Sequence, residues 1–276
     1  MKAIKNILYP TDFSERSRVG YHYCLKLAQQ LQAAVHVLHV YRIDLGVPVT
    51  DAIAYKMIEE RKKNTHFKLG SFAHLQKSGH QKLTEGLDIH AHAAVGMAED
   101  EVVEFANTKG MDLIVMPTKG EHDLLEEMFG SVTTAVCSTA NCPVLVLPEK
   151  APYRPIMEVA YATDFSKENT ERLQVAVQLA NFFEAVLHLV HVYQKERATT
   201  EEVAALLAQL PDHTVTKYQE LQGDTVQEGI QTFLEDHQID LLVAYSPPKN
   251  FFERLFRLST TRHLLHQVTC PLMIMR

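Results

Sequence analysis

The chain has 276 residues, 46% of them hydrophobic and 22% charged, a composition typical of a globular protein long enough for two domains. The formal net charge is −7 and no basic block is present, which argues against nucleic acid as a partner. No run of about 18 apolar residues could cross a membrane, and the N-terminus leads straight into a predicted strand without the apolar core of a signal peptide. We therefore expect a cytoplasmic protein with no membrane partner.

Four cysteines are scattered through the chain without a CxxC pair: Cys24, Cys137, Cys142 and Cys270. This spacing favours reduced thiols over a disulfide framework or a zinc ribbon. We interpret Cys24 as a core residue and Cys142 as structural rather than reactive.

An internal repeat is the strongest feature of the sequence. Residues 7–14 (Ile-Leu-Tyr-Pro-Thr-Asp-Phe-Ser) return as residues 159–166 (Val-Ala-Tyr-Ala-Thr-Asp-Phe-Ser), an offset of 152 (164 − 12). Asp-Leu-Ile-Val at 112–115 returns as Asp-Leu-Leu-Val at 240–243, an offset of only 128 (240 − 112). The second copy is therefore shorter by about 24 residues, lost between its second and fourth strands. Two tandem domains are predicted, over residues 1–150 and 151–276.

The elements of the first copy alternate between strand and helix. A strand near 7–10 precedes a helix whose apolar residues recur at spacings of three and four from Gly20 to Leu31. Next come a strand at 35–41, a helical segment near 50–77, a strand near 87–94 and a helix with its apolar face from Ala98 to Ala106. A fully apolar strand at 113–116, a helix from about 132 and a last strand at 144–147 complete the copy.

The second copy repeats this order, with strands at 186–193 and 271–275 and a shortened helix near 200–209. Alternating helices and buried strands predict an α/β fold: two tandem doubly wound domains, each with a parallel five-stranded sheet and helices on both faces. Ligands of such sheets bind beyond the carboxyl ends of the strands, at the point where the strand order reverses.

Two loops are expected to meet at that edge. After the fourth strand, Thr118, Lys119, Gly120 and then Gly130 with Ser131 supply the parts of a phosphate cradle, because glycine lets an anion approach the N–H groups at a helix start. An ordinary strand–loop–helix connection would also use glycine. After the first strand, Asp12 could accept from a ribose hydroxyl or an adenine amine. Asp12 could equally cap the first helix or form an Asx turn, and Ser14 could do the same.

These segments resemble the universal stress protein family. The Thr-Asp-Phe-Ser entry, the His-Val-Tyr end of the second strand, the glycine loop and the Cys-Pro-Val-Leu-Val ending carry the resemblance, which covers nearly the whole chain twice. It implies an adenine nucleotide alpha hydrolase-like fold. It also implies that Asp12 binds ribose or adenine, that Val40 offers backbone atoms to the adenine edge, and that further residues line the pocket: Pro10, Thr11, Met116, Val132 and Thr133.

Nucleotide-binding members share a motif of glycine, two residues, glycine, nine residues, then glycine with Ser or Thr. The first copy has Pro117 at the first glycine, followed by Gly120, Gly130 and Ser131 at the family's spacing. Proline removes a backbone donor and fixes φ. The second copy has lost every glycine of the motif, at Ser246, Lys249 and Ser259, before Thr260. Side chains then stand where a phosphate needs open backbone, so nucleotide is expected in domain 1 only.

The family resemblance also implies pairing through the last strands, edge to edge. In a tandem chain the strands at 144–147 and 271–275 could pair within one molecule as a pseudo-dimer and cover two edges, and a homodimer is a further possibility. Alternatively, charges or loops cap these edges.

Other chemistry has weak support. The sequence has no GxxxxGK[ST] loop, no GxGxxG fingerprint and no GxSxG elbow. His90 and His92 share one face of a strand and could coordinate a metal, but no cysteine or carboxylate stands at ligand spacing. His36 and His39 should face opposite sides of a strand. We expect no metal except Mg²⁺ accompanying a nucleotide.

Two functions remain open. The first is a stress-response regulator that binds ATP or a related adenine nucleotide in domain 1, with at most slow hydrolysis because no dedicated base is evident. It would act through protein partners that the sequence does not identify. The second is a nucleotide-free interaction module, in which the 50–80 segment or the pseudo-dimer surface recruits proteins or an apolar ligand.

Overall fold

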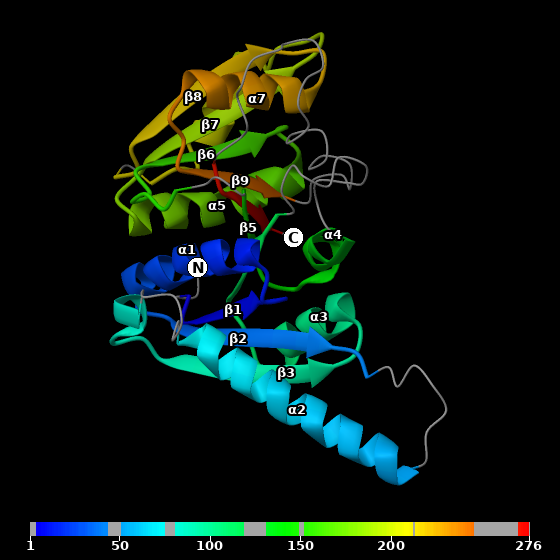
Figure 1. Cartoon of the computed structure of the whole chain (residues 1–276). Coiled ribbons are helices and arrows are strands. Elements are labelled where there is room, and N and C mark those ends of the chain that lie inside the picture. Colours follow the sequence, from blue (N-terminus) through cyan, green and yellow to red (C-terminus); the bar gives the residue numbers. More distant parts are fainter. Residues whose placement is uncertain are drawn as a thin grey trace. The chain divides into compact units, whose positions relative to one another are not determined.

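The computed structural model describes residues 4–43, 51–74, 81–118, 131–148, 152–211, 213–245 and 270–275. The described chain is α/β, with five strands and four α-helices in the first repeat and five strands and three α-helices in the second (Figure 1). It separates into two compact units: an N-terminal unit of residues 2–117 and 130–144, and a C-terminal unit that contains residues 118–129 and 145–276. The domain boundary near residue 150 remains a prediction.

The elements of the first repeat follow the predicted order. They are β1 (Asn6–Pro10), α1 (Glu15–Leu31), β2 (Ala34–Tyr41), α2 (Asp51–Ala73), the short 3₁₀ turn η1 (Gln81–Thr84), β3 (Ile89–Val95), α3 (Ala98–Thr108), β4 (Leu113–Pro117), α4 (Ser131–Thr139) and β5 (Val144–Leu147).

The second repeat has β6 (Glu158–Thr163), α5 (Lys167–Phe182), β7 (Val186–Tyr193), α6 (Thr200–Leu207), β8 (Thr216–Gln222), α7 (Val226–Asp236), β9 (Leu241–Tyr245) and β10 (Leu272–Met275). The predicted loss between the second and fourth strands falls largely on one helix, since α2 has 23 residues and α6 has 8.

The N-terminal unit has a parallel sheet in the order β3-β2-β1-β4. Tyr9 is directed toward α1, where its hydroxyl donates to the carbonyl oxygen of Ser17 at 2.5 Å. His92 of β3 is directed toward α3, where its ring lies 4.7 Å from the ring of Phe105. Because side chains alternate along each strand, helices cover both faces of this sheet, as the doubly wound prediction requires.

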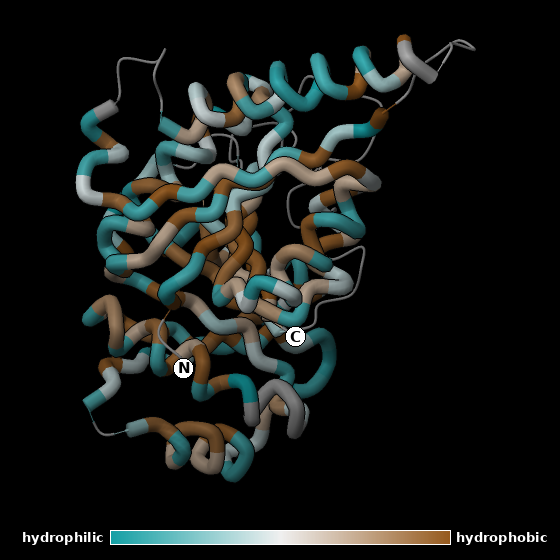
Figure 2. Tube along the Cα trace, turned by 90° about the horizontal axis from the view of Figure 1, so that it is seen from below, coloured by the Kyte–Doolittle hydropathy of each residue, from teal (hydrophilic) through white to brown (hydrophobic). Residues whose placement is uncertain are grey.

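The C-terminal unit has the strand order β5-β10-β9-β6-β7-β8, with parallel pairing from β10 through β8. The strands of both units carry the main concentration of hydrophobic residues (Figure 2). In β4, for example, Leu113, Ile114 and Val115 are fully buried. Burial on this scale is the main term that stabilises either unit, at about 25 cal/mol per Å² of apolar surface.

One carboxylate in each repeat closes the amino-terminal edge of the sheet. Asp112, just before β4, accepts the backbone N–H groups of Lys5 and Asn6 at 3.0 Å each. Asp240, just before β9, accepts those of Met157 and Glu158 at 2.9 and 3.1 Å. The repeated Asp-Leu signature therefore has a structural purpose at the start of two strands.

All four cysteines are free thiols, and three of them are buried. Burial raises the pKa of Cys142, the most exposed of the four, to about 11, so its thiol stays protonated at neutral pH. Among the described residues, no helix is long and apolar enough to cross a membrane.

Candidate functional site

The carboxyl ends of three neighbouring strands define the candidate site in the N-terminal unit. In the parallel order β2-β1-β4, these ends lie at Tyr41, Pro10 and Pro117. From β1 the chain adds β2 and then β3 on one side of the sheet, whereas β4 pairs with the other side of β1. The strand order therefore reverses between β1 and β4. This is the switch point at which open α/β sheets bind ligands.

The loop from β1 to α1 is a tightly bonded turn. The N–H of Thr11 donates to the carbonyl of Leu38 at 2.8 Å, and the hydroxyl oxygen of Thr11 accepts the N–H of Phe13 at 3.0 Å. The carboxylate of Asp12 accepts the N–H of Ser14 at 2.9 Å, which makes an Asx turn. Ser14, not Asp12, is the N-cap of α1, because its hydroxyl oxygen accepts the N–H of Ser17.

The second repeat builds the same turn. Asp164 accepts the N–H of Ser166 at 2.9 Å, and Thr163 accepts the N–H of Phe165 at 3.2 Å. Phe13 and Phe165 both have positive φ, 66° and 58°. The Thr-Asp-Phe-Ser sequence is therefore explained by the turn itself. A ribose or adenine role for the exposed carboxylate of Asp12 is additional to this structural role and stays a prediction.

A histidine that sequence reasoning did not assign to the site fastens the same turn. The ring nitrogen Nδ1 of His39 lies 2.7 Å from the carbonyl oxygen of Thr11, and since a carbonyl can only accept, Nδ1 carries the proton. The ring centroid of His39 lies 4.1 Å from that of Phe13. His191 repeats the bond to Thr163 at 3.0 Å. The repeat of histidine and threonine at one offset is the sequence signal that could have revealed it.

Val40 lies beyond the end of β1. The β1–β2 ladder ends with Pro10 opposite Leu38, so β2 continues past the last residue of its neighbour. On its other side Val40 is paired with Ala94 of β3. Val40 is half-buried, and on the side of β1 its backbone has no partner in the strand ladder. Val40 is the residue whose backbone atoms were predicted to contact the adenine edge.

Pro117 is the last residue of β4, so the strand ends one residue later than the predicted 113–116. Its ring packs on α1 at Gly20, where a Cβ atom would lie 3.2 Å from the Pro117 Cβ and 2.8 Å from the hydroxyl of Tyr9. Met116, the preceding residue, is buried. Pro117 thus has a packing partner that explains a bulky residue at a position where the family motif has glycine.

The helix side of the site begins at Ser131, the first residue of α4. Thr133 is buried and Val132 is half-buried. The first N–H groups of any α-helix have no partner within the helix. Ser131, Val132 and Thr133 therefore present backbone donors at a helix N-terminus in the same unit as the β1 loop.

Several predicted site residues are not placed by this geometry. Lys119, Gly120 and Gly130 lie outside the described residues, as do positions 246–260 of the second repeat and the side chain of Ser131. Thr118 is grouped with the C-terminal unit, where its N–H donates to the carbonyl of Leu147 at 2.9 Å. Its backbone donor is thus already used, so only its hydroxyl could serve a phosphate.

The histidines of β2 and β3 form a cluster on the α3 face. Nδ1 of His36 lies 3.1 Å from Nε2 of His92, and the rings of His36 and His90 stack at 4.8 Å. Burial and the neighbouring histidines lower the pKa of His36 and of His92. His36 and His39 contact different partners, as the alternation of the strand predicted. Within the described ranges, no group of three or more His, Cys, Asp or Glu residues could hold a metal ion.

Comparison with known proteins gives a consistent family. The model of the universal stress protein family matches residues 3–148 and again 155–276. The universal stress proteins MJ0531 and MJ0577 of Methanocaldococcus jannaschii are each 33% identical over about half of this chain (52% and 53%), covering 81% and 96% of their own lengths. A universal stress protein structure from Archaeoglobus fulgidus aligns over 100% of this chain and 99% of its own, with a TM-score of 0.71 and 17% identity, which shows a shared fold. Two matched segments cover almost the entire sequence, so the chain belongs to the universal stress protein family.

Proposed function

We propose that the chain binds ATP or a related adenine nucleotide at the carboxyl edge of the N-terminal unit. The observation that supports this proposal is the pairing, at the switch point, of the β1 loop with the overhanging end of β2, in the same compact unit as the N-terminus of α4. An apolar edge beside β2 suits a purine base, and a helix N-terminus suits phosphate.

In this proposal, different described residues contact the adenine, the ribose and the phosphates. Val40 offers backbone atoms to adenine, Asp12 accepts from a ribose hydroxyl, and the first N–H groups of α4 face the phosphates. Pro10, Thr11, Met116, Val132 and Thr133 line the pocket. Lys119, Ser131 and the glycines at 120 and 130 complete it by the family motif, and Mg²⁺ would accompany the nucleotide.

Hydrolysis in this proposal is slow at most. The carboxylate of Asp12 already accepts a backbone N–H, and His39 donates its Nδ1 proton to a carbonyl. Both side chains therefore hold the turn in place, and we base the expectation of slow hydrolysis on the lack of a motif for rapid phosphoryl transfer in the sequence. The nucleotide would act as a regulatory ligand in the response to stress rather than as a substrate.

The first test is to release bound ligand from the purified full chain by heat and to separate it by anion exchange. The expected result is adenine nucleotide near one equivalent per chain. A value near two would contradict the assignment to the first repeat alone, and no nucleotide together with no calorimetric response to added ATP would contradict the proposal itself.

Substitution of the glycine loop sharpens this test. Gly130→Val should abolish ATP binding while circular dichroism and the melting temperature stay close to those of the parent, because a β-branched side chain would block the phosphate. Ser259→Val, at the corresponding place in the second repeat, is the matched control and should leave binding unchanged. Normal ATP binding by Gly130→Val would show that the site is misplaced.

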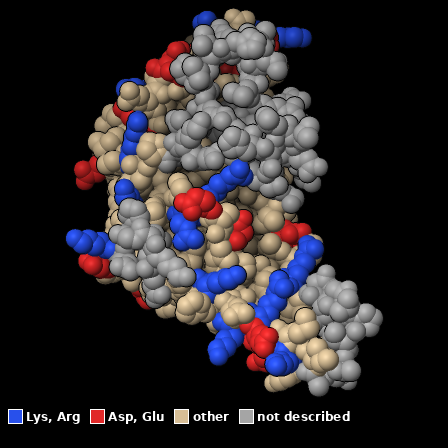
Figure 3. Space-filling view, viewed as in Figure 1, with Lys and Arg blue, Asp and Glu red and all other residues tan. Residues whose placement is uncertain are grey.

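A second candidate function is a nucleotide-free interaction module, and α2 favours it. This helix exposes large apolar side chains among its charges: Tyr55 and Phe67 are each 68% exposed and Ile53 is 51% exposed. Charged side chains of both signs lie together over α2 (Figure 3, lower right). A surface that mixes exposed apolar and charged side chains suits a protein partner, and it would be the functional surface if no nucleotide were found.

We also propose that the last strands pair as a pseudo-dimer within one chain. The support is the strand order of the C-terminal unit, in which β5, the last strand of the first repeat, is next to β10, the last strand of the second. Pairing would cover two strand edges that otherwise invite association with another chain.

A further inference from the structure

The C-terminal unit contains a pocket at the amino-terminal edge of its sheet, the edge opposite to the one that family members use for ligands. Its volume is about 540 Å³, within the range of small-molecule sites. It is lined by residues from the start of β6, from β7 and β8, and from the connection between α7 and β9, among them Arg154, Glu158, His188, Lys217, His237 and Asp240. All of them belong to one compact unit.

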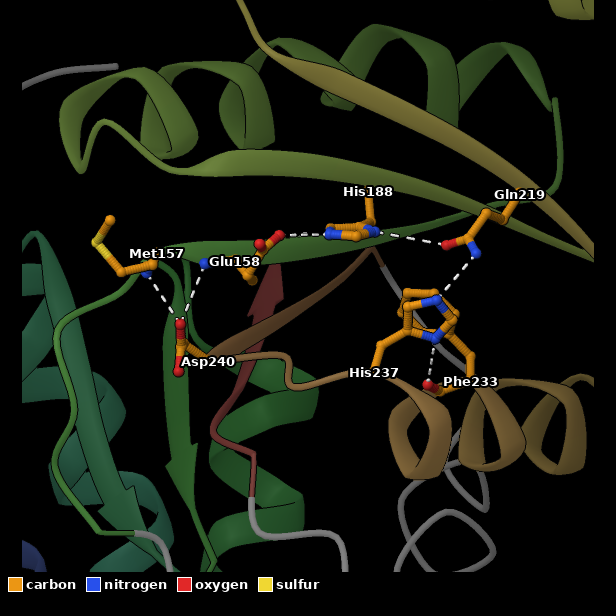
Figure 4. A network of polar contacts seen from close by, with 7 residues as sticks. All are labelled: Met157, Glu158, His188, Gln219, Phe233, His237 and Asp240. Carbon is orange, nitrogen blue, oxygen red and sulfur yellow. Dashed lines mark hydrogen bonds and ion pairs between the residues drawn. The ribbon is translucent and has the colours of Figure 1, made fainter.

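The two carboxylates of this pocket are already engaged by the protein. Oε2 of Glu158 lies 2.5 Å from Nε2 of His188, whose side chain is only 3% exposed. Oδ2 of Asp240 accepts the N–H groups of Met157 and Glu158 (Figure 4). Each carboxylate therefore has one oxygen that is already held by a protein group.

A continuous set of hydrogen bonds fixes the pocket wall. His237 donates from Nδ1 to the carbonyl of Phe233 at 3.0 Å, so its Nε2 accepts from the amide nitrogen of Gln219 at 3.0 Å. The amide oxygen of Gln219 then accepts from Nδ1 of His188 at 3.4 Å. Figure 4 shows these side chains in a row that ends at Glu158.

This direction of donation decides the charge at the end of the row. Nδ1 of His188 uses its proton toward Gln219, so the short contact between Nε2 and Glu158 needs a second proton between ring and carboxylate. His188 and Glu158 thus form a hydrogen-bonded acid–base pair. The pair contributes polar walls but no net charge to the pocket.

The cations at the pocket opening are in the opposite situation. Arg154 and Lys217 are both exposed, and within the described part of the chain neither side chain makes a hydrogen bond or ion pair with a protein group. Among the described residues, the lining thus carries two basic side chains without a protein partner against one carboxylate, Asp240, that no basic side chain pairs, so positive charge is in excess. Pro155 and Ile239 add apolar surface beside them. A pocket of this kind favours a compact organic anion.

We infer that this pocket binds a small anion with two negative charges, a phosphate or a dicarboxylate, between Arg154 and Lys217. This site is independent of the nucleotide site proposed for the N-terminal unit, since it lies in the other unit and at the opposite strand edge. The shared chemistry is a pair of anionic oxygens that accept charge-assisted hydrogen bonds.

The test is a titration of the full chain labelled at its methionine methyl groups, with the Met157 methyl signal assigned through Met157→Leu. The probes are inorganic phosphate and succinate in separate titrations at low salt, where exposed charges act most strongly, and glycerol is the neutral control. The Met157 signal should shift saturably with at least one of the two anions and stay unchanged with glycerol. The anion that gives the lower Kd identifies the preferred group.

Charge variants separate this site from any other anion site. The double variant Arg154→Gln and Lys217→Gln should raise the Kd about tenfold or more, and Gln238→Glu should also raise it by adding negative charge at the opening. Lys195→Gln, which removes an exposed charge after β7 in the same unit, should leave the Kd within about twofold. Saturation with ATP beforehand should not change the Met157 titration.

Three results would overturn the inference. These are the absence of a saturable Met157 shift with either anion, a Kd that the double variant leaves unchanged, and loss of the shift once ATP is bound. None of them bears on nucleotide binding by the first repeat, which the Gly130→Val variant tests separately.

Discussion

At the residue scale, Asp12 shows how one side chain can carry a structural and a functional explanation at once. Its carboxylate makes an Asx turn with Ser14, and Asp164 makes the same turn with Ser166 in the second repeat, where every motif glycine is missing. Because the turn is present in both repeats, it cannot by itself indicate a nucleotide site. The two roles have to be separated by substitution.

The first prediction separates them with Asp12→Asn and Asp12→Ala. Asparagine can still accept the N–H of Ser14, so Asp12→Asn should keep stability within about 0.5 kcal/mol, whereas Asp12→Ala should lose about 1 kcal/mol. Loss of the charge should weaken ATP binding about tenfold in both variants. Urea unfolding and calorimetry measure the two effects. Asp164→Ala is the control and should lose stability without a change in ATP affinity. Unchanged ATP affinity in Asp12→Asn would show that the Asp12 carboxylate has only the structural role in the turn.

The histidine cluster of the N-terminal unit leads to a second prediction, on pH. Burial first, and then the nearby His90, lowers the pKa of both His36 and His92. In the unfolded chain these rings titrate near about 6.5, so between the two pKa values the unfolded state binds more protons. Stability that is present above pH ~6.5 is therefore lost as the pH falls through the unfolded and then the folded pKa.

His92→Gln should reduce this loss. Glutamine is the residue of the second repeat at this position, because Leu38 is opposite His92 and Val190 is opposite Gln219. The free energy of unfolding should fall less steeply between pH 7.5 and 5 in His92→Gln than in the parent. His74→Gln, at an exposed residue after α2, should keep the parent slope. Equal slopes in all three proteins would contradict the cluster's contribution.

At the scale of elements, the two repeats join the first helix to the fourth strand by different chemistry. In the first repeat Pro117 packs on Gly20 of α1. In the second repeat, the guanidinium of Arg172 in α5 lies 5.1 Å from the ring centroid of Tyr245, the last residue of β9. One contact is close packing and the other is a cation–π contact. The helix–strand arrangement has therefore been kept while the side chains that hold it have diverged.

Gly20→Ala tests the close packing. The new methyl would meet the Tyr9 hydroxyl at 2.8 Å and the ring of Pro117 at 3.2 Å, and Tyr9 is buried and bonded to Ser17. Overpacking of about 1–3 kcal/mol should exceed the helix-propensity gain of about 1 kcal/mol, so the variant should be less stable. Gly70→Ala in α2 is the matched control: nothing lies within 4 Å of its Cβ position, so it should be stabilised by up to about 1 kcal/mol. A more stable Gly20→Ala would show that α1 can move away from Pro117.

The elements themselves could be predicted well from sequence, and the reasons are visible in particular residues. The buried runs at 113–116 and 144–147 and the three-and-four spacing in α1 follow directly from apolar side chains, so their bounds agree closely with the structure. In α5 the same spacing also includes Arg172, which is exposed, because a long side chain at the rim of a face satisfies the spacing without being buried.

The candidate site was less predictable, because bonds between distant residues define it. The family resemblance named Asp12 and Val40, but no local pattern could show that His39 donates to Thr11 or that Pro117 packs on Gly20. The amino-edge pocket was missed for the same reason. Its residues come from four separate segments. Only the structure shows which of their charged side chains already have a partner.

At the scale of the whole molecule, the chain is a duplication in which each repeat contains the same pair of hydrogen bonds to an aspartate. Asp112 accepts two backbone N–H groups at the start of β1, and Asp240 accepts two at the start of β6. Each pair of bonds joins the first strand of its repeat to the strand beside it. This symmetry offers a way to perturb either unit by the same chemical change.

The last prediction compares Asp112→Ala with Asp240→Ala. Each variant leaves two strand-edge N–H groups without their charged acceptor, which should cost its own unit about 2 kcal/mol. With a urea m-value of about 2 kcal/mol/M, the unfolding midpoint of that unit should fall by about 1 M. We expect two transitions, with Asp112→Ala lowering one, Asp240→Ala lowering the other, and the double variant lowering both additively, since the sites lie in different units. Hydrogen exchange should assign each transition by the strand amides that lose protection. If instead both variants shifted a single shared transition by the same amount, the two repeats would unfold as one cooperative molecule, and the duplication would have produced one folding unit instead of two.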